Sequence, residues 1–212
     1  DTINYATTGS IDHAISMLNK NDEDFYTKVQ KITEDHAIEA SISKVIGSEA
    51  LAYCADEAVQ IFGGSGYCEE YPAAGVYRDE RINRIFEGTN EINRLIISGT
   101  CLKKAILEEL PIRDVLFEMR NGVSHSNNFD NLIKQESEVV DYSKGLCLRV
   151  LDDLINIYGQ DFKNKQWLIE PFANVVSSIF IMHNCFLRYF QLEEGNHKNL
   201  TLPVMRLSIC QQ

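Results

Sequence analysis

Apolar side chains recur every three or four residues along most of this 212-residue chain. That spacing places them on one face of an α-helix. The pattern predicts helices over about residues 2–20, 25–62, 90–109, 134–159 and 165–192. Polar residues at 19–24 predict a loop, and the stretch from Asp35 to Glu39 can hold a break. The sequence therefore predicts an all-α protein.

The first three predicted helices form most of an up-down bundle. Small residues in the second helix allow its neighbours to approach closely, namely Ala37, Ala40, Ser41, Ala50, Ala52, Ala55 and Ala58. The third helix ends before Pro111, after which the composition changes. We therefore expect an incomplete helical-bundle domain at residues 1–110 and a second helical region at residues 111–212.

The second region contains an Asn- and Ser-rich stretch at 121–131, which predicts an exposed loop. The helix predicted at 165–192 is very apolar, yet polar residues interrupt it: Asn174, Ser177, Ser178, His183, Asn184 and Arg188. It therefore lacks the run of about 20 apolar residues that a membrane span needs. We expect it to be buried on most sides. Pro203 predicts one more short helix that continues beyond Gln212.

The formal net charge of −11 argues against nucleic acid as a partner, because binding to phosphates relies on basic side chains. It argues equally against an anionic membrane surface. The six cysteines have no Cys-x-x-Cys spacing, so we expect reduced thiols rather than a disulfide framework. The five histidines are also scattered, and the sequence predicts no metal site.

Three glycines within four residues, Gly63, Gly64 and Gly66, follow the second predicted helix. Glycine adopts positive φ readily and lets the backbone approach a ligand closely. A plain helix terminus is the simpler interpretation. The glycines do not form a dinucleotide-binding fingerprint, because no strand pattern precedes Gly63.

One carboxylate, Glu87, lies in a short loop after a run of charges at 78–84, which we expect to form a solvated, salt-bridged face. The apolar neighbours Ile82, Ile85 and Phe86 disfavour a charged carboxylate, which would make Glu87 a stronger general base. The simpler interpretation is a surface acid that complements the dipole of the next helix.

The helix after this loop has a recognisable start. Thr89 or Asn90 can cap its N-terminus with a side-chain oxygen. Glu91 then falls in the first turn, where negative charge is favourable.

Two motifs occur in order: Gln60-x-x-Gly63-Gly64-x-Gly66-Tyr67, and Arg78-Asp79 followed by Glu87-Gly88-Thr89. With the residues around them, they resemble the C-terminal helical domain of the acyl-CoA dehydrogenases. The similarity covers about residues 5–99 and is strongest from Ser43 to Ile97. The resemblance implies an FAD-dependent enzyme that oxidises fatty acyl-CoA in β-oxidation.

The same resemblance assigns residue roles. Glu87 matches the catalytic base, which removes the pro-R proton from the carbon beside the thioester while the next carbon loses a hydride to the flavin. The product is a trans-2-enoyl-CoA. Gly88 matches a residue at the substrate thioester. We expect the flanking helices to hold the Glu87 side chain in a cleft of the bundle, where the reacting C–H bond lies.

The resemblance also implies cofactor contacts. Gln60, Gly63 and Gly64 match residues that approach the FAD of a neighbouring subunit. Thr89 and Glu91 match residues along the diphosphate and adenosine part of FAD, although position 91 is often glutamine in the family. Some members carry an arginine near the substrate about a dozen residues past the base. This chain has Ser98-Gly99-Thr100 there, so that contact is not expected.

The implied partners are an acyl-CoA substrate, electron-transfer flavoprotein as electron acceptor, and further copies of the chain in a dimer or tetramer. The implied location is the bacterial cytoplasm or the mitochondrial matrix. Two alternatives stay open: a helical oligomerisation or interaction module without activity, and a flavin-dependent acyl-CoA oxidase. A nitroalkane oxidase is disfavoured, because it would be expected to carry aspartate at position 87.

Compared with the family, the chain starts inside the C-terminal domain and lacks the N-terminal helical and middle β domains. We therefore expect a fragment of a longer protein, inactive alone and binding FAD poorly or not at all. The region at 111–212 resembles, in position and helical character, the C-terminal extension of very-long-chain-type members.

Overall fold

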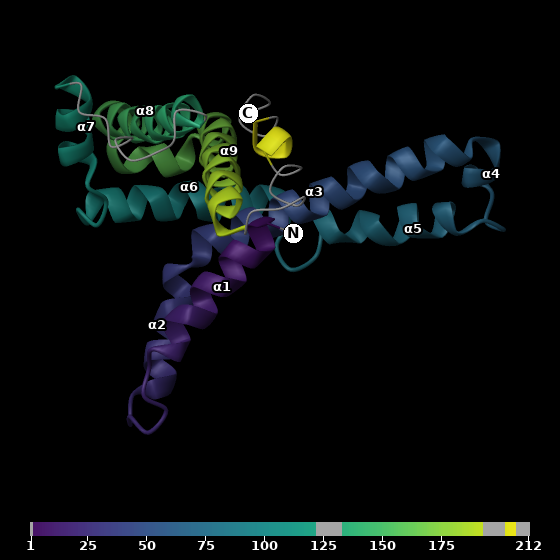
Figure 1. Ribbon diagram of the computed structural model, residues 1–212, viewed down its shortest axis with the longest axis horizontal. Coiled ribbons are helices and arrows are strands. Elements are labelled where there is room, and N and C mark those ends of the chain that lie inside the picture. Colours follow the sequence, from purple (N-terminus) through teal and green to yellow (C-terminus); the bar gives the residue numbers. More distant parts are fainter. Residues whose placement is uncertain (1, 122–132, 193–201, 207–212) are drawn as a thin grey trace.

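A computed structural model describes residues 2–121, 133–192 and 202–206, and within these ranges the regular structure is entirely helical. Three arms leave a common junction (Figure 1). One arm is the α1–α2 hairpin, the second is the α3–α5 pair, and the third is the packed group α6–α9. The all-α class predicted from the sequence is confirmed.

The first arm consists of α1 (Thr2–Ser16) and α2 (Phe25–Asp35). The long helix α3 (Ala37–Phe62) follows after a break at His36, inside the stretch where a break was predicted. The first half of α3 packs along α6 (Asn90–Ile106) in the antiparallel sense, since Ser48 bonds Asn90 and the backbone of Asp35 bonds Lys104. The second half of α3 extends beyond α6 and packs against α5 instead.

The segment between α3 and α6 is more helical than the sequence indicated. A short turn, α4 (Gly64–Tyr67), leads to α5 (Pro72–Glu80) and a 3₁₀ turn at Arg81–Arg84. Pro72 suits the first turn of α5, where its missing N–H costs nothing. Small residues permit α5 to lie against α3, and Ala73 of α5 and Ala55 of α3 are both buried.

The charged run at 78–84 is not uniformly solvated, which corrects our expectation. Arg78 pairs with Glu69 on the open surface at 2.8 Å. Glu80, by contrast, is only 3% exposed and accepts a bond from the Arg84 guanidinium at 3.3 Å. Helical spacing explains the difference, because it turns Glu80 towards α3 while Arg78 points away.

The third arm continues with α7 (Ile112–Arg120), α8 (Lys134–Tyr158), a 3₁₀ turn (Gly159–Asn164) and α9 (Gln166–Gln191). The bounds of α8 and α9 agree with the prediction to within one residue, whereas α7 was not predicted. Residues 202–206 are helical around Pro203. Most of the loop predicted at 121–131, and the continuation past residue 206, lie outside the described residues.

The largest buried cluster joins residues from both predicted regions. Cys101 and Leu102 of α6 pack with Ile112, Leu151, Phe162, Ile169 and Phe172. A second cluster joins Ile42, Ile97 and Ala173, all at most 1% exposed, where α3, α6 and α9 meet. Burying one such isoleucine contributes about 1.5–3 kcal/mol. The division at residue 110 stays a prediction, and the core does not stop there.

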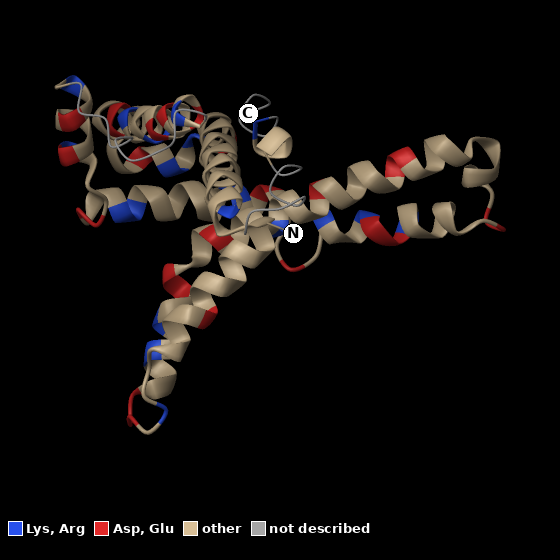
Figure 2. Cartoon of the chain, in the orientation of Figure 1, with Lys and Arg blue, Asp and Glu red and all other residues tan. Residues whose placement is uncertain are grey.

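Acidic and basic side chains are spread over all three arms, whereas residues 171–187 of α9 carry neither (Figure 2). Among the described residues, no helix is both long and apolar enough to cross a membrane. Five of the six cysteines are free thiols, and Cys210 lies outside the described residues.

Candidate functional site

The loop that carries Glu87 joins the 3₁₀ turn to α6 and has an unusual backbone. Glu87 has φ +54° and Gly88 has φ +84°, so both lie in the left-handed region. A residue with a side chain pays about 1–2 kcal/mol there, a cost often met at functional positions. A Cβ on Gly88 would also lie 3.2 Å from Nδ2 of Asn93. Position 88 therefore requires glycine, while position 87 tolerates strain.

Two side chains clamp the carbonyl oxygen of Gly88. Lys44 of α3 donates to it from Nζ at 2.7 Å, and Asn93 of α6 donates from Nδ2 at 2.9 Å. Asn93 also donates to the carbonyl of Thr89 at 3.0 Å. The loop is thus bonded to both helices that flank it, as the sequence led us to expect in general terms.

Asn90, 2% exposed, is the buried polar centre beneath this loop. Its Oδ1 accepts from Lys44 Nζ at 2.8 Å. Its Nδ2 donates to Ser48 Oγ at 3.0 Å and to Glu49 Oε1 at 3.2 Å. Because buried amides cost free energy unless they are bonded, this network fixes the register of α6 against α3.

The predicted N-cap is Thr89, whose Oγ1 accepts from the backbone N–H of Ile92 at 3.2 Å. Glu91 occupies the first turn, as predicted. Its own backbone N–H, followed by the Thr89 side chain, lowers the pKa of the Glu91 carboxyl. Glu91 is therefore a charged hydrogen-bond acceptor at the start of α6.

The helix α9 supports α6 from the other side. Arg94 is 13% exposed and forms a salt bridge with Glu49 at 2.8 Å, while its Nε donates to Asn174 Oδ1 at 2.8 Å. Ser98, fully buried, donates to the carbonyl of Ile169 at 2.9 Å. Ser98 therefore ties α6 to the start of α9.

The Glu87 side chain is exposed in this chain, which corrects the expectation that the bundle itself encloses it. Ile85 and Phe86 are 49% and 46% exposed. The physical reason is that Glu87 sits at the convex end of a loop, and the described helices pack against the backbone of that loop rather than over its side chain. Enclosure of the carboxylate requires another surface.

The glycine turn lies at the far end of the α3–α5 arm. Gly63, with φ +59°, ends α3, and its N–H bonds the carbonyl of Gln60 at 3.1 Å. Gly66 is buried against α3, because a Cβ there would lie 2.6 Å from the carbonyl oxygen of Val59. Gly64 is different: it is exposed, and a Cβ would meet nothing within 4 Å.

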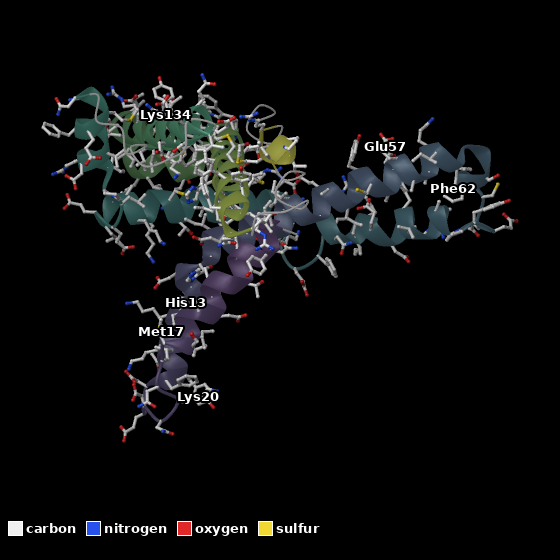
Figure 3. The ribbon with its side chains drawn as sticks, viewed as in Figure 1. His13, Met17, Lys20, Glu57, Phe62 and Lys134 are labelled. Atoms are coloured by element: carbon white, nitrogen blue, oxygen red, sulfur yellow. The ribbon has the colours of Figure 1, made fainter. Side chains whose placement is uncertain are left out.

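The chain therefore presents two separate sites rather than one. Lys44 contacts the Glu87 loop, and Gln60 lies 16 residues further along α3, about 24 Å at 1.5 Å per residue. Figure 3 labels Phe62 near the distal end of this arm, away from the junction where α6 begins. Gln60, Gly63 and Gly64 form the distal group, and Glu87, Gly88, Thr89 and Glu91 form the junction group.

Sequence reasoning named Asn90 only as a possible cap, and it did not find the other residues that hold the junction group: Lys44, Ser48, Asn93 and Arg94. One signal was available, because Lys44 is the single basic residue in the 26 residues of α3. A lone cation in an apolar and small-residue helix implies a specific acceptor, although its position across the chain cannot be read from the sequence.

Comparison with known proteins gives this geometry a context. Residues 13–102 match the family described as acyl-CoA dehydrogenase, C-terminal domain. A probable acyl-CoA dehydrogenase of Bacillus subtilis (strain 168) is 37% identical over 191 residues, which is 87% of this chain and 32% of that protein. The human mitochondrial short-chain specific acyl-CoA dehydrogenase is 49% identical over 65 residues, 31% of this chain and 16% of that protein.

A solved structure resembles nearly the whole chain. The acyl-CoA dehydrogenase from Bacillus anthracis, crystallised in complex with FAD, superposes with a TM-score of 0.87 at 33% identity, covering 98% of this chain and 36% of that one. The fold is thus that of an acyl-CoA dehydrogenase C-terminal helical domain. The chain belongs to the acyl-CoA dehydrogenase family. It spans about a third of the length of the Bacillus subtilis relative.

Proposed function

We propose that this chain supplies the catalytic base of an FAD-dependent acyl-CoA dehydrogenase that converts fatty acyl-CoA to trans-2-enoyl-CoA in β-oxidation. The observation that carries the proposal is the clamped loop, in which Glu87 projects from a left-handed backbone fixed by Lys44 and Asn93. Such strain persists where the surrounding structure over-determines it, as at functional sites.

Each junction residue has a chemical task in this proposal. A Glu87 carboxylate oxygen accepts the proton from the carbon beside the thioester carbonyl. That carbon is acidified by the carbonyl, and Gly88, which has no side chain, lets the thioester approach the backbone. The exposed apolar side chains of Ile85 and Phe86 suit contact with substrate or with another part of the protein, which removes water from around Glu87 and strengthens it as a base.

FAD, when bound, supplies the acceptor for the hydride that leaves the next carbon. The residues present fit this group. The start of the 17-residue helix α6 carries the positive end of the helix dipole, which favours an anionic diphosphate nearby. Glu91 is a charged acceptor, so it fits a hydroxyl of the adenosine part rather than a phosphate. The open surface over Gly64 admits a flat ligand close to the backbone.

The two-site arrangement favours an oligomer. Because Gln60, Gly63 and Gly64 lie about 24 Å from the junction group, one small cofactor site need not include both groups of one chain. The α3–α4–α5 arm also exposes large apolar residues: Tyr53, Ile61, Phe62, Tyr67, Tyr71, Val76 and Tyr77. We propose a homodimer or homotetramer in which the distal group approaches the FAD of a neighbouring copy.

Electron-transfer flavoprotein is the proposed electron acceptor, and the bacterial cytoplasm or the mitochondrial matrix the proposed location. The test is an assay of the flavin-loaded protein, as it occurs in the cell, against acyl-CoA thioesters from short to long chains. Formation of 2-enoyl-CoA that depends on an electron acceptor supports the proposal. Stoichiometric hydrogen peroxide from O₂ identifies an oxidase instead, and no turnover with any thioester contradicts both.

A further inference from the structure

Lys44 reaches from α3 to the loop that presents Glu87, although the two are more than forty residues apart in sequence. Its Nζ donates to the carbonyl oxygen of Gly88 at 2.7 Å and to Oδ1 of Asn90 at 2.8 Å. Both acceptors are neutral oxygens, so the cation makes charge-assisted hydrogen bonds, which are stronger than neutral ones. These two partners belong to the loop and to the first residue of α6.

The carbonyl that Lys44 holds lies one residue past Glu87, in the peptide between Gly88 and Thr89. Asn93 donates to the same oxygen at 2.9 Å. On the other side of Glu87, the N–H of Phe86 bonds the carbonyl of Ile82 at 3.0 Å. The backbone around Glu87 is therefore held on both sides, and the bonds to the Gly88 carbonyl restrain a glycine that would otherwise rotate freely because it has no Cβ. This limits the directions that the Cα–Cβ bond of Glu87 can take.

Within the described part of the chain, the Glu87 side chain is placed by its backbone. The residue is exposed, and its carboxylate has no hydrogen-bond partner among the described residues. Its placement thus depends on backbone geometry. A reacting group displaced by about 1 Å can lose about a hundredfold in rate.

We propose that Lys44 is a positioning residue for the base: it acts through the Gly88 carbonyl to set the direction of the Glu87 side chain. This inference rests on the proposed function. Lys44 does not touch the reacting atoms and takes no part in the proton transfer. Its loss therefore slows the chemical step more than it weakens substrate binding.

The experiment compares Lys44→Met, Lys44→Arg and Lys44→Gln in the flavin-loaded protein with a matched control, Lys31→Met. Lys31 is exposed on α2 and remote from the loop. Steady-state kinetics with the best acyl-CoA give kcat and KM separately, and the flavin absorbance and melting temperature of each variant are recorded.

We expect Lys44→Met to lower kcat by about tenfold to a hundredfold with little change in KM or flavin content. Arginine can still donate to the Gly88 carbonyl, so Lys44→Arg should recover most of kcat. Lys31→Met should match the wild type. If Lys44→Met does not fold, Lys44→Gln tests the same point, because its neutral amide ends one atom short of the Lys44 Nζ and cannot make the charge-assisted hydrogen bond at that distance.

Wild-type kcat in a folded Lys44→Met or Lys44→Gln variant overturns the inference, as does an arginine variant no better than methionine. Glu87→Gln separates this failure from that of the proposed function. If Glu87→Gln is inactive while Lys44→Met turns over normally, only the positioning role is wrong. If Glu87→Gln turns over at the wild-type rate, the proposed function itself is wrong.

Discussion

Gly88 shows at the scale of one residue how the loop excludes a side chain. Its φ is +84°, and a Cβ at this position would lie 3.2 Å from Nδ2 of Asn93, so alanine meets both backbone strain and crowding. We expect Gly88→Ala to lower the free energy of unfolding by about 1–2 kcal/mol, as measured by chemical denaturation.

The matched control is Gly47→Ala, in the middle of α3. A Cβ there meets nothing within 4 Å, and alanine is the better helix former by about 1 kcal/mol. Gly47→Ala should therefore leave stability unchanged or raise it. Equal destabilisation by both substitutions would show that the conformation assigned to Gly88 is wrong.

Two cysteines in the third arm are expected to be chemically inert. Burial raises the pKa of Cys101 from an ordinary 9.0 to about 12, and that of Cys147 to about 11. The thiolate is the nucleophile, so alkylation at about pH 8 should modify exposed Cys54 and Cys68 and spare Cys101 and Cys147. Mass spectrometry of the labelled peptides checks this.

The raised pKa of Cys101 also determines how the free energy of unfolding changes with pH. A thiol whose pKa is raised in the folded state stabilises the fold below pH 9.0, and that contribution is lost as pH rises from 9.0 towards about 12. Cys101→Ala should therefore make the unfolding free energy less dependent on pH in this window. An unchanged alkaline slope would count against deep burial of the thiol.

At the scale of elements, two glycines of the turn after α3 are expected to have different roles: Gly66 in packing and Gly64 in binding. Gly66→Ala places a Cβ 2.6 Å from the Val59 carbonyl, whereas Gly64→Ala meets open space. We expect Gly66→Ala to loosen the junction of α3, α4 and α5 and to lower the melting temperature. Gly64→Ala should leave melting of the flavin-free protein unchanged while weakening FAD binding.

Flavin titration and thermal melting of the two variants measure these effects. Each variant should change one of the two measurements and leave the other near its wild-type value. Loss of stability in Gly64→Ala would assign that glycine to packing alone, and unaltered FAD affinity would remove it from the cofactor site.

The sequence predicted the long helices well because their apolar periodicity is strong. The helices α1, α8 and α9, the break at His36 and the cap at Thr89 all follow from local signals. The helix α5 was missed because charged residues at 78–81 conceal its short apolar face. Its packing depends on Ala73, which meets α3 only after the chain reverses.

The candidate site was predictable only in part. Glu87, Gly88 and Thr89 were singled out by the resemblance to the acyl-CoA dehydrogenases, because from residue types alone a surface acid was the simpler interpretation of Glu87. The residues that support this loop and α6 could not be found in the same way, because Lys44 and Asn174 approach from helices distant in sequence. Exposure of Glu87 was mispredicted for a related reason: neighbours in sequence do not reveal which surface covers a side chain.

The whole molecule explains why the site is open. Its three arms diverge from the junction where α6 begins (Figure 1), and both Glu87, in the loop before α6, and Gly64, at the far end of α3, are exposed. The core continues from α6 into α7, α8 and α9 across residue 110, so the second region supports the helix that begins at the site. The proposed role of Glu87 as a base therefore requires other surfaces to enclose its carboxylate.

The most direct test is a single turnover without oxygen. Flavin-loaded wild type, Glu87→Gln and the exposed-residue control Glu23→Gln are mixed with saturating acyl-CoA, and the absorbance of oxidised flavin is followed. We expect wild type and Glu23→Gln to bleach rapidly and Glu87→Gln to bind the thioester yet keep its flavin oxidised. Bleaching of Glu87→Gln at the wild-type rate would contradict the assignment of Glu87 as the base.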